Sequence, residues 1–468
     1  MEESLVSSPG GCLIVLGTAL GYHLLPLKES CGFRTVICID ILADAAGLID
    51  KNPCTSFLGK MKNLHILGGY DPEELHHRLN ELLDFEELSQ ISVVAHAPSM
   101  RAAGPYYRDA EDAVRGVIQR KAGNSATRRA FEGLYLRNSL KNLEFLPHMY
   151  GVRHLFGLLR GYSGVVVTSG PSLNRNLHAL KEWSGFLYII AVDSALPVLN
   201  RHGIRADFVV SIDPQVHIME HIFGAGDGKE LWVTTPSAYG IFNRVSGKVF
   251  CSLNSHPVAQ LLEELYTEQI GSVDSRTGTV AGDALMLAVK LGLERIALLG
   301  FDFSFPDFSI YARGSAYQER FGRFFQNRLH PVEEQNGRYI MKASQGLKSG
   351  SMLTRRSFLQ YCEAMERLIR DESMTGVVQV DGPGLQLGGV PSMSFESFLK
   401  GCVQGDRGDL AAQCDFIPPL NDELDTTALL RALGNEDIFT RIIDASLDKS
   451  SERKRQQCRA LCRSIHFT

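Results

Sequence analysis

The chain has 468 residues, of which 44% are hydrophobic and 22% charged, and its formal net charge is −5 at pH 7. This length exceeds one ordinary hydrophobic core, so two or three domains are expected. The composition is that of a globular protein, and the net negative charge argues against a nucleic-acid-binding protein. The ten cysteines are scattered without a C-x-x-C pair, which predicts reduced thiols in a cytoplasmic protein.

The N-terminal segment "CLIVLGTAL" is apolar, but it is shorter than the roughly 18 residues that a membrane span needs. The acidic Glu2 and Glu3 precede it, where a secretion signal would carry basic residues. The segment therefore predicts a strand and a turn, with no membrane insertion.

Two segments predict the same strand–turn–helix–strand order, namely "GGCLIVLGTALGYHLLPLKESCGFRTVICID" and "GVVVTSGPSLNRNLHALKEWSGFLYIIAVD". Gly17 precedes Asp40 by the same spacing by which Gly170 precedes Asp193. The fold class predicted is α/β, with two Rossmann-like domains that each contain a parallel sheet. Asp40 could contact a ribose, but "GTALGYHL" lacks the full dinucleotide fingerprint, which favours a degenerate scaffold.

The pattern along the chain divides it into four predicted regions. These are an N-terminal Rossmann-like subdomain at 1–70, a helical connector at 71–160, a central catalytic domain at 161–394 and a helical C-terminal region at 395–468. The connector is predicted from one-sided apolar stripes such as "DPEELHHRLNELLDFEELSQ". The basic end "DKSSERKRQQCRALCRS" is typical of solvated surface, with partner binding as the alternative.

The turn in "VVVTSGPSLNRNL" is the first candidate binding site. A strand that runs into Gly-Pro and then a helix leaves backbone N–H groups unpaired at the helix start, and these favour an anion. We therefore predict that Ser169, Gly170, Pro171 and Ser172 contact a phosphate, with an ordinary N-cap at Ser172 or Asn174 as the alternative. On this hypothesis, Gly170→Val abolishes nucleotide binding and leaves the fold intact.

Polar residues also close three neighbouring predicted strands. Asp193, Asp213 and Asp302 each follow a strand, with Gly300 just before the last of them. Such carboxylates would share one sheet edge, where they either contact a ligand or cation or act as caps and turn formers. Small residues around Thr279 in "SRTGTVAGDALML" open a helix, either to hold a second polar group or to pack tightly.

The segment "IYARGSAYQERFGRFFQNR" is predicted as a lid over that edge. Tyr311 lies in it with Arg313, Arg320 and Arg323, and the last two share a helix face. Arginine suits a sugar carboxylate or a phosphate because its fork makes two hydrogen bonds, although solvated surface charge is the alternative. The sequence contains no P-loop and no D-x-D pair, so no metal site is predicted.

Four segments together resemble the motility-associated factor (Maf) flagellin glycosyltransferases: "VVVTSGPSLNRNL", "IIAVDSALPVLNRHGIRADFVVSIDP", "GTVAGDALMLAVKLGLERIALLGFDFSF" and "VVQVDGPGLQLGGVPSM". The central domain of that family is similar to bacterial sialyltransferases and to an archaeal MptE-like pterin diphosphokinase. The resemblance implies transfer of a nonulosonic acid, of pseudaminic or legionaminic type, from its CMP-activated donor to Ser/Thr hydroxyls of flagellin. It implies no required cofactor, and it leaves the part beyond about residue 400 unassigned.

The resemblance also implies roles for individual residues. Asp193, Asp213, Thr279 and Gly300 would join the Gly-Pro-Ser turn in the nucleotide site, and Tyr311 would hold the donor phosphate. The arginines of the lid would bind the sugar carboxylate.

The sequence departs from the sialyltransferases at two points. Ser169 stands where those enzymes have an asparagine, and "GLKSGSMLTRR" lacks their catalytic histidine. The general base therefore stays open among Asp302, Asp213 and a donor phosphate oxygen.

Two other functions remain as alternatives. One is a diphosphokinase that uses Mg-ATP on a pterin, with Asp193, Asp213 and Asp302 as magnesium ligands. The other is a non-catalytic, flagellin-binding motility factor.

Overall fold

The chain folds into two compact units, Met1–Ala130 and Phe131–Thr468. The computed structural model describes residues 11–28, 33–83, 91–222, 229–242, 244–324, 331–402, 407–422, 424–435, 437–438, 440–442, 456 and 458–459. Each unit contains a parallel β-sheet with helices between its strands, so the predicted α/β class is confirmed.

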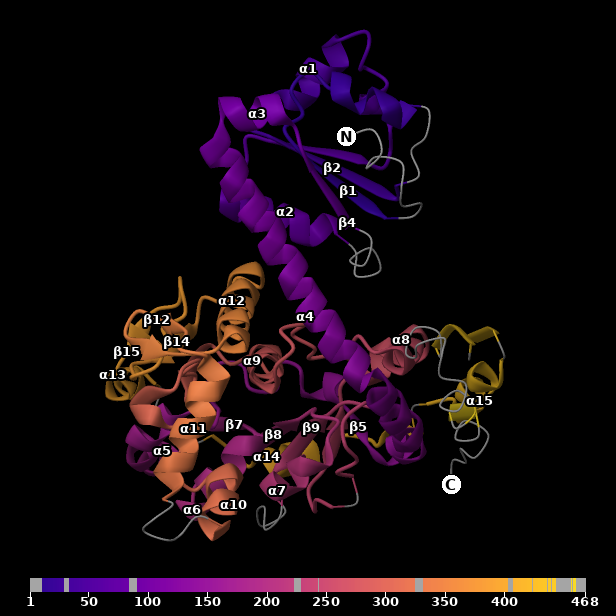
Figure 1. Ribbon diagram of the computed structural model, residues 1–468. Coiled ribbons are helices and arrows are strands. Elements are labelled where there is room, and N and C mark those ends of the chain that lie inside the picture. The colour runs from indigo at the N-terminus through magenta and orange to yellow at the C-terminus, as the bar shows by residue number, and fades with distance from the viewer. Residues whose placement is uncertain are drawn as a thin grey trace. The chain divides into compact units, whose positions relative to one another are not determined.

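The first unit is built on a four-stranded parallel sheet of order β3–β2–β1–β4 (Figure 1). Its strands are β1 (Cys12–Leu16), β2 (Thr35–Asp40), β3 (Leu64–Gly68) and β4 (Ile91–Ala95). Its helices are η2 (Tyr22–Lys28), α1 (Ala45–Lys51), η3 (Leu58–Lys60), α2 (Pro72–Leu82), α3 (Ala97–Ala102) and the first part of α4 (Gly104–Asn142). The continuous apolar run of β1 is fully buried, as expected for a strand covered on both faces.

Asp40 ends β2 inside this unit and is held by the chain's own backbone. Its Oδ2 accepts hydrogen bonds from the amides of Thr18 and Ala19 at 2.7 and 2.9 Å, and its Oδ1 accepts one from Leu42 at 2.9 Å. These bonds favour the degenerate scaffold over a ribose contact for Asp40.

The structure differs from the predicted boundaries at the connector. Within 71–160, which was predicted to be helical throughout, β4 pairs with β1 and completes the first sheet, and α4 crosses from one unit to the other. The side chains of β4 are half-buried or exposed, so the strand lacks the apolar run that identifies β1. The first unit therefore extends well beyond the predicted 1–70.

The second unit contains a nine-stranded parallel sheet of order β15–β14–β11–β6–β7–β8–β9–β10–β5. Its strands are β5 (Tyr150–Gly151), β6 (Ser163–Val167), β7 (Tyr188–Val192), β8 (Phe208–Ser211), β9 (Leu231–Thr234), β10 (Val249–Cys251), β11 (Arg295–Leu299), β14 (Val377–Val380) and β15 (Ser392–Met393). From β6 the chain adds strands in one direction up to β10, and then returns to place β11 on the other side of β6. The sheet thus has a topological switch point between β6 and β11, where ligands bind in open α/β sheets.

Helices and a small hairpin connect these strands. The α-helices are α5 (Leu177–Trp183), α6 (Leu196–Arg201), α7 (Met219–Ile222), α8 (Pro257–Ile270), α9 (Val280–Lys290), α10 (Ala316–Phe324), α11 (Val332–Ser344), α12 (Arg356–Asp371), α13 (Phe395–Lys400), α14 (Leu410–Cys414) and α15 (Thr426–Gly434). The 3-10 helices are η5 (Leu143–His148), η6 (Val152–Leu155), η7 (Pro171–Arg175), η8 (Asp193–Ala195), η9 (Val216–Ile218), η10 (Pro306–Phe308) and η11 (Leu420–Asp422). The hairpin pairs β12 (Lys348–Ser349) with β13 (Met352–Leu353).

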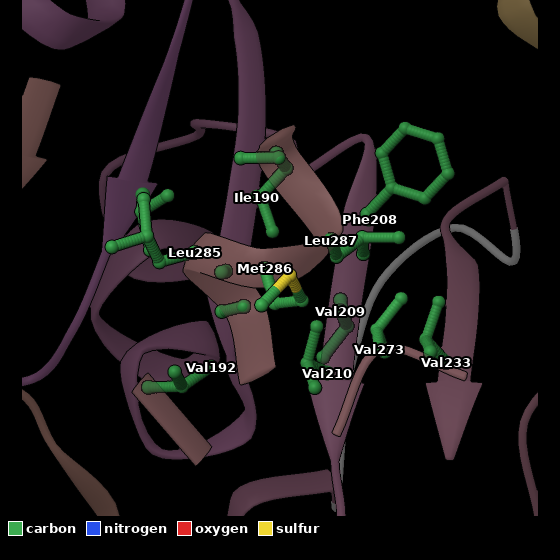
Figure 2. Close-up of a cluster of buried hydrophobic side chains, with 14 of the residues drawn as sticks. Ile190, Val192, Phe208, Val209, Val210, Val233, Val273, Leu285, Met286 and Leu287 are labelled. Carbon is green, nitrogen blue, oxygen red and sulfur yellow. The ribbon is translucent and has the colours of Figure 1, made fainter. Parts of the chain in front are cut away.

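Helix α9 forms the centre of the core of the second unit. Its residues from Gly282 to Ala288 are all buried, so it is apolar around most of its circumference. Figure 2 shows Leu285 and Met286 of this helix close to Ile190 of β7 and Val210 of β8. The helix packs on β6, β7 and β8, and this packing fixes its N-terminus beside the carboxyl ends of those strands.

The described part of the C-terminal region belongs to the second unit. Leu410, Cys414, Leu420 and Leu429 are buried in the same hydrophobic cluster as the nine-stranded sheet. The Lys248 ammonium donates a hydrogen bond of 2.7 Å to the backbone carbonyl of Cys414. The region predicted as helical at 395–468 contains α13, α14 and α15, and most of its basic end lies outside the described residues.

Across the described segments, no helix has the length and the apolar character needed to span a bilayer. The cysteines within those segments are free thiols, and Cys54 alone among them is exposed.

Candidate active site in the second unit

A cavity of about 250 Å³ lies at the switch point between β6 and β11. It is lined by residues that follow β6, β7 and β11, by the N-terminus of α9 and by side chains of α12. The lining residues are Thr168, Ser169, Gly170, Pro171, Val192, Asp193, Ser194, Thr279, Val280, Ala281, Gly300, Phe301, Asp302, Phe303, Ser304, Ile310, Tyr311, Phe358 and Tyr361. Eight of the predicted site residues are therefore brought together here: Ser169, Gly170, Pro171, Asp193, Thr279, Gly300, Asp302 and Tyr311.

The loops after β6 and β11 approach each other closely through two glycines. A Cβ added to Gly170 would lie 2.1 Å from the carbonyl oxygen of Gly300, and one added to Gly300 would lie 2.4 Å from that of Thr168. Gly300 also has a φ of +79°, which disfavours any side chain. The prediction that Gly170→Val leaves the fold intact is therefore wrong, because the glycine accommodates the chain's own backbone.

Asp302 holds the turn that was predicted to bind a phosphate. Its Oδ2 accepts a hydrogen bond of 2.8 Å from the backbone amide of Ser172. Burial raises the pKa of Asp302, and the hydrogen bond from Ser172 works against that shift. Since η7 is a short 3-10 helix and this amide already has an acceptor, the turn offers fewer donors than predicted. Ser172 does not line the cavity.

The N-terminus of α9 supplies a second set of backbone amides. Thr279 caps the helix, its Oγ1 accepting a hydrogen bond of 3.1 Å from the amide of Gly282. Val280 and Ala281, the first two helical residues, line the cavity. The first amides of a helix have no partner within the helix and carry the positive end of its dipole, so this end of the cavity suits an anion.

A row of hydroxyls and a carboxyl fix the loop that leads into α9. Thr279 Oγ1 lies 3.1 Å from Thr277 Oγ1, which lies 2.8 Å from Ser275 Oγ. Ser275 donates from its hydroxyl at 2.6 Å and from its amide at 2.9 Å to Asp283 Oδ1. Burial raises the pKa of Asp283 to about 7. Gly282 leaves room for the row, because a Cβ there would lie 2.0 Å from Thr277 Oγ1.

Asp193 brings a second carboxylate to the cavity, together with a histidine that sequence reasoning missed. Its Oδ2 accepts a 2.7 Å hydrogen bond from the Ser211 hydroxyl. Its Oδ1 lies 3.4 Å from His221 Nδ1, which is an ion-pair distance without hydrogen-bond geometry. His221 could have been found from the sequence, because His217 and His221 follow a predicted strand and are spaced by about one helical turn.

Asp213 lies outside the cavity lining, unlike Asp193 and Asp302. Its Oδ1 accepts a hydrogen bond from the Gln215 amide at 2.8 Å, and its Oδ2 lies 3.7 Å from His217 Nε2. Burial raises the pKa of Asp213, and the nearby negative charge of Asp193 adds to that rise.

Tyr311 lines the cavity, and its ring is tilted by 57° against that of Tyr317, with ring centroids 5.3 Å apart. Partial burial raises the pKa of Tyr311, and the positive charge of Arg355 opposes the rise. A phenol with a raised pKa stays protonated at neutral pH and can donate a hydrogen bond to an anion.

The arginines predicted in the lid do not reach the cavity lining. Arg320 pairs with Glu220 at 3.3 Å on the surface, and Arg313 is exposed. The side chain of Arg323 lies outside those that the structure describes. Two other arginines outside the lining act by their charge on residues of the cavity wall: Arg175 on Asp302, and Arg355, which immediately precedes α12, on Tyr311.

Comparison with known proteins agrees with this architecture. Residues 137–308 match the family model described as "6-hydroxymethylpterin diphosphokinase MptE-like". The chain aligns over 97% of its length with 74% of the Maf glycosyltransferase from Magnetospirillum magneticum AMB-1, with a TM-score of 0.59 and 15% identity. The fold of the chain is therefore similar to that of the Maf glycosyltransferase, and residues 137–308 within it are similar to the MptE-like family.

The matched segment contains the loops after β6, β7 and β11, whereas Tyr311 and Arg355 lie beyond its last residue. An uncharacterized protein of Treponema pallidum (strain Nichols) is 30% identical over 89 residues, which are 18% of this chain. The match spans 40% of the length of that relative.

Proposed function

We propose that the second unit is a glycosyltransferase that moves a nonulosonic acid, of pseudaminic or legionaminic type, from a CMP-activated donor to Ser/Thr hydroxyls of flagellin. The observation that carries the proposal is the cavity at the β6/β11 switch point of a fold shared with a Maf glycosyltransferase. Ligands of open α/β sheets bind at such switch points, and a nucleotide with its phosphate at a helix start is a frequent case.

In this proposal the donor phosphate lies against the start of α9. The amides of Val280 and Ala281 would donate to the phosphate oxygens, and the row of hydroxyls behind Thr279 keeps that turn rigid. Tyr311, held protonated by its raised pKa, would donate to the phosphate as the bond to the sugar breaks.

The acceptor hydroxyl must lose a proton as its oxygen attacks the anomeric carbon and CMP leaves. Asp193 is better positioned to take that proton than the predicted Asp302 and Asp213. Asp193 and Asp302 both line the cavity, and each has one carboxylate oxygen hydrogen-bonded, but the other oxygen of Asp193 lies 3.4 Å from His221 Nδ1. Asp213 lies outside the lining. A positioned base contributes on the order of 10²–10⁴-fold to such a step.

The diphosphokinase alternative is favoured by the description of the matched family model. It would use magnesium, and Asp193, Asp213 and Asp302 do not gather as one set of three ligands, because Asp213 lies outside the cavity that the other two line. The part of the chain that the structure describes contains no group of three acidic, histidine or cysteine side chains suited to one metal ion.

A thermal-shift comparison of CMP with Mg-ATP separates the two enzymes. CMP at 100 times its Kd should stabilise the second unit by about 2.7 kcal/mol, since a ligand that binds only the folded state shifts the unfolding equilibrium. Mg-ATP and Mg²⁺ alone should leave the unfolding midpoint unchanged. Stabilisation by Mg-ATP without any by CMP would overturn the proposal in favour of the kinase.

A further inference from the structure

The Arg355 side chain contacts two aromatic residues beside the cavity. Its guanidinium carbon lies 4.1 Å from the centroid of the Phe358 ring, and its Nη1 donates a 3.3 Å hydrogen bond to the Tyr339 hydroxyl. Phe358 and Tyr311 both line the cavity, and the Arg355 charge acts on Tyr311. The guanidinium plane is therefore oriented by an aromatic ring at the cavity wall.

The positive charge of Arg355 has no counter-charge among the described residues. Two other arginines of the second unit have one: Arg175 lies 3.8 Å from Asp307, and Arg320 lies 3.3 Å from Glu220. No carboxylate of the described segments lies within ion-pair distance of Arg355, and its Nε is buried without a hydrogen-bond acceptor. A buried donor on a charged group costs free energy unless an acceptor reaches it, so the arrangement suits an anionic ligand.

We propose that Arg355 binds the carboxylate of the transferred sugar, and so makes the site select donors that carry an acidic sugar. This inference rests on the proposed function. The guanidinium fork matches a carboxylate with two parallel hydrogen bonds, and stacking on Phe358 holds the fork in place. A donor phosphate has the same anionic chemistry, so the experiment must separate the two groups.

Calorimetric titration of the full chain with CMP and with CMP-N-acetylneuraminic acid makes that separation. Arg355→Met should weaken binding of the sugar nucleotide by about 10- to 100-fold, as expected for lost hydrogen bonds to a charged group, and change CMP binding less than about twofold. Arg356→Met is the matched control, because this neighbouring arginine is exposed, and it should change neither affinity. Arg355→Lys keeps the charge but loses the fork, so its loss should be intermediate and again confined to the sugar nucleotide.

Each other outcome overturns the inference in a recognisable way. Equal affinity of the unmodified chain for both ligands, or an unchanged Arg355→Met, would mean that the carboxylate is not bound by Arg355. An equal loss for both ligands would assign the arginine to the phosphate. If Arg355→Met does not fold, Arg355→Lys replaces it: a loss confined to the sugar nucleotide supports the inference, and an equal loss for both ligands or no loss overturns it. Absence of binding to either ligand by the unmodified chain would remove the proposed function itself.

Discussion

Replacing Gly170 with alanine should destabilise the second unit by about 3 kcal/mol, at the upper end of what overpacking costs. The added Cβ would lie 2.1 Å from the Gly300 carbonyl oxygen and 2.5 Å from Asp302 Oδ2. The first of these is backbone, so the loops after β6 and β11 must separate to admit the methyl group. For a unit that spans Phe131–Thr468, the unfolding midpoint should fall by about 4 °C in a thermal melt followed by circular dichroism.

Gly185→Ala is the control for this substitution. Gly185 is exposed, has no heavy atom within 4 Å of an added Cβ and has no positive φ, so its replacement should leave the midpoint unchanged or slightly raised. A Gly170→Ala chain as stable as the Gly185→Ala chain would show that the two loops are not in the contact described above.

Arg407→Met should destabilise the second unit by about 3–5 kcal/mol, because it leaves a buried carboxylate without its partner. Arg407 Nη1 lies 2.7 Å from Asp207 Oδ2, and the two side chains are 17% and 3% exposed. The same nitrogen donates to the carbonyl of Leu187, and Asp207 Oδ2 also accepts from the Ile189 amide. This cluster ties the C-terminal region to the beginning of β7 and β8.

The stability lost in the Arg407→Met chain should also depend on pH. Burial raises the pKa of Asp207 in the folded chain and Arg407 lowers it, so removing the arginine raises that pKa further. A folded-state pKa above the unfolded value means that stability falls as pH rises, so the variant should be impaired more at pH 8 than at pH 5.

The surface pair of Arg441 with Glu264, at 3.3 Å and with both side chains more than half exposed, provides the comparison for Arg407. Arg441→Met should cost about 0–1 kcal/mol. Chemical denaturation at both pH values measures all three chains. Equal effects of the two arginine variants, or a smaller loss at pH 8 than at pH 5, would contradict the role given to Asp207.

Strands that are buried on both faces could be located from the sequence, whereas a half-exposed strand could not. The β-branched run "GVVV" and the apolar "YIIAV" lie in strands buried on both faces, and sequence alone located them in β6 and β7. Strand β4 was missed because its side chains are half-buried or exposed and it follows a long polar helical segment. Its pairing with β1 joins segments far apart in the sequence, so no local sequence pattern predicts it.

The sequence predicted many of the residues that line the candidate site, but not the hydrogen bonds and charges around them. Residues at the carboxyl ends of parallel strands must gather at one edge, so Gly170, Asp193 and Asp302 could be grouped from sequence. The bond between Asp302 and Ser172 joins groups 130 residues apart, so its effect on the phosphate turn needed a structure. A role for Arg355 was not predicted for the same reason, since only the fold brings its charge close enough to act on Tyr311.

The intact mass of flagellin tests the central claim most directly. Flagellin would be co-expressed with an active CMP-nonulosonate pathway, with and without this chain, and its mass compared. The chain should add whole increments of one nonulosonic acid residue, and these should disappear in an Asp193→Asn chain that still binds CMP. Flagellin of unchanged mass, with the donor present and the chain folded, would contradict a glycosyltransferase and favour a non-catalytic flagellin-binding factor.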